Sequence, residues 1–338
     1  MPDFKSIGEF GFINQIATHP TPNRVLCGIG DDCAVIEQSS TQVRLVTTDM
    51  MVEGVHFFTD TPPEGLGHKL LAVNISDIAA MGGTPTDAVI SLAVPTHHDA
   101  GYLERLYNGL YACADRFDVA IVGGDTTRSN NQLVLNISLT GHMHRNHVCY
   151  RSGAQTGDLI YVSGTLGDAA GGLSLIRDQI KMNREDRTHL LRKFNRPEPQ
   201  LTLGQTLAQT GAVTAMMDVS DGVASDLRHI CKRSQISAVL HASDMPLSEP
   251  FVRFCKKTKQ DATQLALSGG EDYELLFTIH PNRAKDIEHL VQKADFPQMT
   301  CIGYITDQGN DILLTQKDGS QTPLTATGYD HFKTPDKE

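Results

Sequence analysis

The chain has 338 residues, about twice the length of a typical domain, so the sequence predicts two domains or one large one and excludes a single small module. Hydrophobic residues make up 40% and charged residues 20%, a balance that excludes general disorder and supports a substantial core. The 40 acidic and 29 basic residues give a formal net charge of −11 with no basic patch, so we expect no nucleic-acid partner.

We also expect no membrane association and a cytoplasmic location. No stretch approaches the ~18–20 consecutive apolar residues of a membrane-spanning helix, and the first ten residues lack the basic and apolar regions of a signal peptide. The seven cysteines are scattered without a C-x-x-C pair, which favours free thiols over disulfides or a thiolate zinc site.

Helices and strands are expected to alternate through the first half. Apolar residues at helical spacing predict a helix over residues 7–19, ended by prolines. The expected elements that follow are strands at 25–29, 33–36 and 43–48, a helix at 66–81, a strand at 86–94, a helix at 99–117, and strands at 119–122 and 132–140.

The second half continues the alternation. Its expected elements are a strand at 159–162, helices from 168, at 187–194 and at 200–210, a strand at 215–219, a helix from 222, a strand at 273–279, a helix at 283–293 and a strand at 301–305. Glycines after Arg151 mark a joint. The pattern predicts a two-domain α/β (α+β) fold with domains 1–150 and 151–338.

Aspartates recur where predicted strands end and beside glycines. Each one alone fits an ordinary turn or helix N-cap. Asp77 differs, because on the predicted helix it projects with the apolar residues, and a buried carboxylate needs a partner or a metal. Together the carboxylates supply the hard oxygen ligands of a Mg²⁺ site, to which Thr47 and Thr48 can add oxygens. The aspartates of this set are Asp32, Asp49, Asp77, Asp125, Asp218 and Asp221.

Glycine pairs indicate where a phosphate group can approach the backbone, although the signal is generic. Both the P-loop motif and the dinucleotide fingerprint are absent, since Cys33 stands where the third glycine of the fingerprint would be. The glycine pairs are Gly28/Gly30, Gly82/Gly83, Gly123/Gly124 and Gly269/Gly270.

Two further patterns resemble metal sites but favour turns. His142, His144 and His147 are predicted to lie on an exposed hairpin that turns over Arg145 and Asn146. The segment 307–311 has the acidic spacing of a calcium loop but runs into an apolar strand without the closing glutamate, so it is predicted to be a turn between strands.

Eight motifs, in order along nearly the whole chain, resemble the thiamine-monophosphate kinase family of the aminoimidazole-ribonucleotide-synthetase-like superfamily. SGGEDYELLF together with a C-terminal GYDHF is the specific combination. The motifs are GIGDDCAVI (28–36), TTDMMVEGVHF (47–57), AVNISDIAAMGG (72–83), VGGDTTRS (122–129), YRSGAQTGD (150–158), DVSDGVASDL (218–227), SGGEDYELLF (268–277) and GYDHF (328–332).

The resemblance implies ATP-dependent, Mg²⁺-assisted phosphorylation of thiamine monophosphate to thiamine diphosphate. It also implies an N-terminal domain that pairs across a homodimer and a C-terminal domain that completes the substrate site. The implied metal ligands are Asp32, Thr47, Thr48, Asp49, Asp77, Asp125, Asp218 and Asp221. The implied ATP contacts are Gly124, Asp125, Arg151 and Ser220, and the implied substrate contacts are His56, Glu271 and Tyr329, which stands where the family often has Trp.

The chemistry agrees with these assignments. Phosphoryl transfer depends on positioning and charge neutralisation, and the acceptor phosphate is already largely anionic near neutral pH, so no general base is expected. Arg151 is the candidate phosphate clamp, and Glu271 and Tyr329 suit a cationic aromatic substrate. Two alternatives stay open: another ATP-dependent ligase or cyclase of the superfamily, and a non-catalytic nucleotide sensor.

Overall fold

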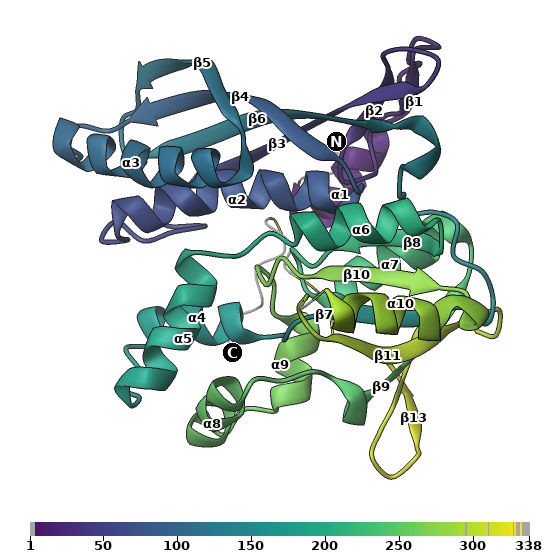
Figure 1. Cartoon of the computed structure of the whole chain (residues 1–338). Coiled ribbons are helices and arrows are strands. Elements are labelled where there is room, and N and C mark those ends of the chain that lie inside the picture. Colours follow the sequence, from purple (N-terminus) through teal and green to yellow (C-terminus); the bar gives the residue numbers. More distant parts are fainter. Residues whose placement is uncertain (1–3, 295, 310, 327, 329–331, 333–338) are drawn as a thin grey trace.

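The computed structural model describes residues 4–294, 296–309, 311–326, 328 and 332. Two sheets, each with its own helices, make up the N-terminal and C-terminal halves of the molecule (Figure 1). The predicted alternation of helices and strands in a two-part α/β fold is confirmed. None of the described helices is long and apolar enough to cross a membrane.

The N-terminal half is built on a six-stranded sheet of order β1-β2-β3-β6-β4-β5, in which only β4 and β5 pair in parallel. Two long helices, α2 and α3, lie on one face of it (Figure 1). On the other face Met50 is 56% exposed and Val89 43% exposed. The elements are α1 (Phe4–Ile16), β1 (Val25–Cys27), β2 (Ala34–Glu37), β3 (Gln42–Val52), α2 (Pro63–Ala80), β4 (Thr84–Val94), α3 (Ala100–Phe117), β5 (Ala120–Arg128), β6 (Val134–His144) and η1 (Arg145–His147).

The C-terminal half contains a seven-stranded sheet of order β13-β12-β9-β11-β7-β10-β8, in which only β9 and β12 pair in parallel. The sequence did not predict β9, α8, α9 or β13, whereas β12 is the apolar strand expected after the turn at residues 307–311. The elements are β7 (Leu159–Ser163), α4 (Asp168–Arg177), α5 (Arg184–Asn195), α6 (Leu201–Thr210), β8 (Val213–Asp218), α7 (Val223–Ser234), β9 (Ser237–His241), η2 (Ala242–Asp244), α8 (Glu249–Thr258), α9 (Ala262–Ser268), β10 (Leu275–Ile279), α10 (Pro281–Lys293), β11 (Met299–Thr306), β12 (Ile312–Thr315) and β13 (Gln321–Pro323).

Helix α2 lies between the two halves and is buried on nearly every side. Two glycines permit its close packing: a Cβ at Gly67 would lie 1.9 Å from Leu106 O of α3, and a Cβ at Gly204 of α6 would lie 2.2 Å from Ala79 O of α2. One apolar core consequently joins α2 and the first sheet to Leu203, Leu207 and other residues of the second half. Polar residues on α2 therefore face either the first sheet or the second half.

The predicted hairpin near residue 145 is wrong. β6 is followed by the short 3₁₀ helix η1 and then by the connection to the second sheet, because the chain crosses between halves here instead of folding back. His142 lies within β6, opposite Arg44 of β3 and Thr84 of β4, while His144 and His147 bring their rings to 5.1 Å.

Candidate active site at the carboxylate cluster

Three of the predicted metal ligands, Asp32, Asp77 and Asp218, converge in the structure. Asp32 follows β1, Asp77 lies in the last turn of α2, and Asp218 ends β8. One carboxylate oxygen from each lies within 4.8 Å of the others. Asp32 and Asp218 are buried, so residues separated by up to 186 positions (218 − 32) form one acidic cluster between the two halves.

Neighbouring polar groups hold these carboxylates in place. The hydroxyl of Thr47 on β3 donates to Asp77 Oδ2, and the hydroxyl of Ser76 donates to Asp218 Oδ2 at 2.6 Å. Asn74 accepts from the backbone N–H of Asp49 at 3.1 Å. Helix α2 thus contacts both halves through adjacent residues: Asp77 accepts from Thr47 of the first sheet, and Ser76 donates to Asp218 of the second half.

The cluster is electrostatically crowded. Burial, followed by the charge of Asp32, raises the pKa of Asp218 to about 7 and that of Asp49 to about 6. Burial and the neighbouring carboxylates also raise the pKa of Asp77. Asp32 Oδ2 is buried and has no hydrogen-bond partner among the residues that the structure describes. An unpaired carboxylate oxygen among crowded acids suits a hard divalent cation, so the donor set fits Mg²⁺.

Arg151 contacts the same cluster from the joint between the halves. Its Nε donates to Asp32 Oδ1 at 3.1 Å, its Nη2 donates to the same oxygen, and its backbone N–H donates to Asp31 Oδ2 at 3.2 Å. Burial and then the charge of Asp32 raise the pKa of Asp31 to about 7 despite the nearby guanidinium. The arginine is therefore positioned by the acidic loop, next to where a phosphate would meet the cation.

The loop after α9 approaches the cluster from the second half. The backbone N–H of Glu271 donates to Ser220 O at 2.8 Å, next to Asp221 and two residues beyond Asp218. A Cβ at Gly270 would lie 2.3 Å from Ser220 O, so this close approach requires glycine. The predicted residues Ser220, Asp221 and Glu271 are thus adjacent to the aspartates.

Glu271 is held by a buried lysine of α2. Its Oε1 lies 2.8 Å from Lys69 Nζ, and the side chain of that lysine is only 3% exposed. The ammonium also lies 4.0 Å from the ring centroid of Phe194. A buried cation fixed from two sides places the Glu271 carboxylate at the junction of α2 with the second half.

His56 lies in the turn after β3. Its Nδ1 accepts the backbone N–H of Val52 at 3.0 Å, which fixes the orientation of the ring. This turn follows Asp49 along the same strand, so the predicted substrate residue His56 and the predicted metal ligand Asp49 are linked by rigid backbone.

The structure does not bring Gly124 and Asp125 to the cluster of the same chain. Asp49 on β3 aligns with Ile137 of β6, then with Ile90 of β4, and then with Gly124 of β5. Three steps between strands of about 4.8 Å separate Asp49 from this position by roughly 14 Å. Asp49 and Asp125 of one chain are therefore too far apart along the sheet to bind the same ion.

The side chain of Thr48 differs from the expectation. The hydroxyl of Thr48 donates to Ile137 O at 2.9 Å, and alternation along β3 places this side chain opposite Thr47, so the hydroxyl is not a ligand of the cluster. Only the main-chain oxygen of Thr48 retains the predicted role. Tyr329 lies outside the described residues.

Comparisons with known proteins agree over nearly the full length. The family model AIR synthase related protein, N-terminal domain, matches residues 30–143, and the corresponding C-terminal domain model matches residues 155–315. The thiamine-monophosphate kinase of Haemophilus influenzae is 38% identical over 332 residues, covering 97% of this chain and 99% of the relative. That of Escherichia coli K12 is 36% identical over 331 residues, covering 97% and 99%.

The chain belongs to the thiamine-monophosphate kinase family.

Solved structures of similar proteins have the same architecture. AaThiL complexed with AMPPCP and TMP superposes with a TM-score of 0.86 at 32% identity and covers 98% of this chain and 99% of that one. The thiamine-monophosphate kinase of Stenotrophomonas maltophilia K279a has a TM-score of 0.75 at 36% identity, covering 91% and 95%. HypE in complex with ATP, at 17% identity and a TM-score of 0.72, shares the fold alone.

Within this kinase-family chain, several residues of the site were not singled out from the sequence. Asp31 is the neighbour of Asp32. Asp226 has a buried Oδ2 that finds no hydrogen-bond partner within the described part of the chain, and burial and the charge of Asp221 raise its pKa. The available signal for Lys69 was that it is the one lysine of a mostly apolar helix. Asn74 and Ser76 gave no comparable signal, because polar residues are ordinary on a helix.

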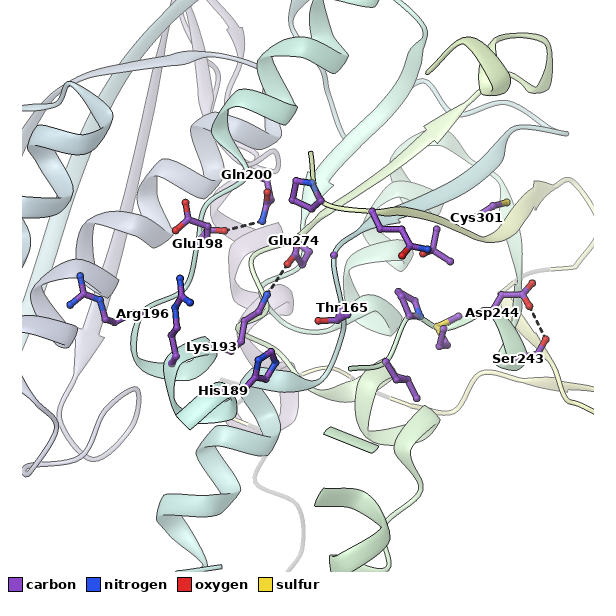
Figure 2. A pocket seen from close by; sticks show the side chains of 18 residues that line it. Thr165, His189, Lys193, Arg196, Glu198, Gln200, Ser243, Asp244, Glu274 and Cys301 are labelled. Carbon is purple, nitrogen blue, oxygen red and sulfur yellow. Dashed lines mark hydrogen bonds and ion pairs between the residues drawn. The ribbon is translucent and has the colours of Figure 1, made fainter. Parts of the chain in front are cut away.

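A cavity of about 860 Å³ in the second half is separate from this cluster (Figure 2). It is lined by residues that include His189, Lys193 and Glu274, and by none of the clustered aspartates. The Lys193 ammonium donates to Glu274 Oε1 at 3.2 Å. The candidate active site of this kinase-family member is accordingly defined by its aspartates and not by this cavity.

His229, on α7 beside the acidic loop, predicts a pH-dependent stability. Burial, with Arg151 and the nearby cations of α7 adding to it, lowers the pKa of His229 to about 4, below the ~6.5 of an exposed histidine. Between these values the unfolded chain binds a proton that the native chain does not, so the free energy of unfolding falls as pH falls. Urea titrations measure the change in the free energy of unfolding that His229→Phe causes. We expect this change to be about 2 kcal/mol more favourable at pH 5 than at pH 7, because phenylalanine does not bind a proton in the unfolded chain. His289→Phe, at an exposed site, is the control. The prediction is contradicted if the effect of His229→Phe on the free energy of unfolding is no more dependent on pH than that of His289→Phe.

Proposed function

We propose that this chain transfers the γ-phosphoryl group of ATP to thiamine monophosphate, forming ADP and thiamine diphosphate in the biosynthesis of that cofactor. It is a thiamine-phosphate kinase. The supporting observation is the likeness over 98% of the chain to AaThiL complexed with AMPPCP and TMP. The internal support is an acidic cluster suited to a cation-bound polyphosphate, with the loop of the predicted acceptor residue Glu271 beside it.

Release of ADP tests this function. Purified protein with ATP and Mg²⁺ is expected to release ADP at a high rate only when thiamine monophosphate is added. Thiamine without its phosphate serves as the control acceptor. A rate that is independent of thiamine monophosphate would contradict the proposal.

Mg²⁺ is the cation that this proposal requires. We assign its ligands to the clustered Asp32, Asp77 and Asp218, together with Asp49, Thr47, the Thr48 main-chain oxygen and Asp221 of the same chain and Asp125 of a second copy. When bound, Mg²⁺ neutralises charge on the polyphosphate and on the transferring group. The chain contributes the fixed carboxylates, and Arg151 beside Asp32 is assigned as the phosphate clamp.

We further propose a homodimer that shares its active sites. The separation between Asp49 and Asp125 along the sheet supports it, as do the exposed apolar residues on the open face and the exposed edge strand β5. In such a dimer Gly124 and Asp125 meet the ATP of the other copy. Mixing inactive Asp49→Asn and Asp125→Asn proteins is then expected to restore activity, because one site of the mixed dimer is intact. A mixture as inactive as its components would contradict the shared site.

We expect no side chain to act as the general base. The acceptor phosphate has a second pKa near ~6, by analogy with phosphorylated side chains, so it is the anionic nucleophile at neutral pH. The acidic limb of the pH–rate profile should therefore follow the substrate, with a midpoint near ~6, in the wild type and in His56→Ala alike. Loss of this limb in a folded, substrate-binding histidine variant would show that the protein supplies the base.

The acceptor is proposed to lie against His56, Glu271 and Tyr329. Glu271, anchored by Lys69, offers a carboxylate to the cationic or amino-bearing rings of the substrate. Glu271→Gln should raise the KM for thiamine monophosphate about tenfold and change the KM for ATP little. Of the two substrates, only thiamine monophosphate is proposed to contact this carboxylate. Steady-state kinetics with each substrate varied measures this, with Glu249→Gln, on the surface of α8, as control. A rise confined to the KM for ATP would place the acceptor elsewhere.

The division into domains and the cellular location are the last two proposals. We propose residues 1–150 as the domain for ATP, Mg²⁺ and dimerisation and residues 151–338 as the domain that completes the substrate site, in line with the positions of the two sheets. We propose a cytoplasmic location, supported by seven cysteines that are all free thiols.

A further inference from the structure

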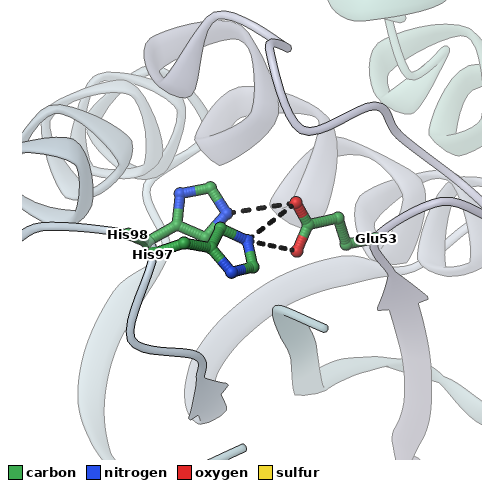
Figure 3. A group of neighbouring side chains, drawn as sticks. All are labelled: Glu53, His97 and His98. Carbon is green, nitrogen blue, oxygen red and sulfur yellow. Dashed lines mark hydrogen bonds and ion pairs between the residues drawn. The ribbon is translucent and has the colours of Figure 1, made fainter. Parts of the chain in front are cut away.

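A second group of potential metal ligands lies apart from the aspartates. It consists of Glu53, which directly follows β3, and of His97 and His98 in the connection between β4 and α3. Figure 3 shows a ring nitrogen of each histidine facing the same carboxylate. His97 Nε2 and His98 Nε2 each lie 3.3 Å from Glu53 Oε1, and the ligand atoms of the three residues all lie within 4.8 Å of one another.

We propose that Glu53, His97 and His98 form a binding site for one divalent transition-metal ion of the zinc class. Two imidazoles and one carboxylate are a borderline-soft donor set that Zn²⁺ and its neighbours in the first transition row prefer. The all-oxygen cluster around Asp32 suits Mg²⁺ instead. The two sites therefore differ in the cation that they select.

The distances favour a shared ion over direct hydrogen bonds. A charge-assisted contact between an imidazole and a carboxylate is usually about 2.7–2.9 Å long. Each of the three contacts here is 3.3 Å, and one imidazole nitrogen faces both oxygens of the carboxylate. Ligands about 2.0–2.1 Å from a tetrahedral Zn²⁺ lie about 3.3–3.4 Å from each other. The separations of the two imidazole nitrogens from Glu53 Oε1 match two edges of such a tetrahedron, and the ligand atoms all lie within 4.8 Å of one another.

The surroundings fix two of the three ligands. Glu53 Oε2 accepts the backbone N–H of Leu133 at 2.8 Å, and the ring of His98 packs on Tyr102 with centroids 4.4 Å apart. Hydrogen-bonded carboxylates and oriented imidazoles are typical of metal sites.

The third ligand lies at the surface and provides access. The Glu53 and His98 side chains are each 5% exposed, whereas that of His97 is 45% exposed. An ion can therefore enter past His97, whose exposed side chain can adjust, and a water molecule can complete the coordination. The bound ion would fasten the turn that carries His56, three residues after Glu53, to the connection that begins α3.

Zinc binding to the full-length protein tests the proposal without any turnover measurement. Metal-free protein is titrated with Zn²⁺ in competition with a chromogenic chelator, in excess Mg²⁺ so that the aspartates are occupied. We expect one tight equivalent of Zn²⁺ per chain, and about 100-fold weaker binding in His97→Ala and in Glu53→Gln because each loses one of three protein ligands. Zn²⁺ should also raise the Tm of the wild type but not that of either variant.

Two matched variants locate the bound ion. His144→Ala removes a histidine from the other histidine pair, and Asp77→Asn removes a carboxylate from the aspartate cluster. Both should retain the tight equivalent. Co²⁺ as a probe should give the visible absorption of a four-coordinate nitrogen and oxygen site in the wild type, and lose it in His97→Ala. Absence of a tight equivalent in the wild type, or its loss in His144→Ala or Asp77→Asn with His97→Ala unaffected, would overturn the proposal.

Discussion

Asp218→Asn is expected to lower kcat by about 10³-fold, since cation-mediated charge neutralisation contributes several kcal/mol to phosphoryl transfer. Asp218 shares the cluster with Asp32 and Asp77, and its Oδ2 accepts the hydroxyl of Ser76. Asparagine retains an oxygen for that hydrogen bond but loses the charge. The measurement is steady-state ADP release at saturating Mg²⁺ and substrates.

The same variant should remain folded. Burial and neighbouring acids already raise the pKa of Asp218 to about 7, so removal of one charge relieves repulsion in the metal-free protein. Its Tm without Mg²⁺ at pH 8 is expected to equal or exceed that of the wild type. Asp178→Asn, on an exposed aspartate paired with Arg177, is the control for the loss of one acidic residue. A kcat within threefold of wild type would contradict the metal assignment.

Arg151→Lys is expected to lower kcat/KM for ATP by about 100-fold. The guanidinium contacts Asp32 through two nitrogens and can present its remaining donors to a phosphate, whereas an ammonium is a single point charge. The change preserves the positive charge, so the loss in kcat/KM reports the geometry of the guanidinium donors. The kinetic constants for ATP, together with a direct binding measurement using a non-hydrolysable ATP analogue, check this prediction.

Arg233→Lys provides the matched control. Arg233 contacts the same acidic loop, but through the backbone oxygens of Ile29 and Gly30, at 3.1 Å and 2.9 Å. If Arg151 only braces this loop, both lysine variants should have similar small effects on ATP kinetics. That equality would contradict its role as a phosphate clamp.

The sequence predicted most of the helices and strands because their hydrophobic periodicity is strong and glycines and prolines mark their ends. Helix α2 and strand β4 were found within a few residues, since their apolar patterns and flanking glycines and prolines are clear. The short strand β13 was missed, because three residues give too little periodicity. The predicted hairpin after β6 was wrong because turn-forming residues do not reveal whether the chain folds back or crosses to another sheet.

The candidate site was predictable in its ligands and less so in its geometry. The aspartates stood out by their positions at strand ends and beside glycines, and Asp32, Asp77 and Asp218 do converge. The ion pair of Lys69 with Glu271 joins residues 202 positions apart (271 − 69), and no local pattern reports such a contact. The same reason concealed the approach of Glu53 to a histidine pair more than 40 residues later.

The most direct test of the central claim follows the γ-phosphoryl group itself. Purified protein is incubated with γ-³²P-labelled ATP, Mg²⁺ and thiamine monophosphate, and the products are separated. A kinase places one label in thiamine diphosphate for each ADP formed, with no matching inorganic phosphate. A ligase or cyclase of the same superfamily would instead release the label as inorganic phosphate in step with ADP, and that result would contradict the account.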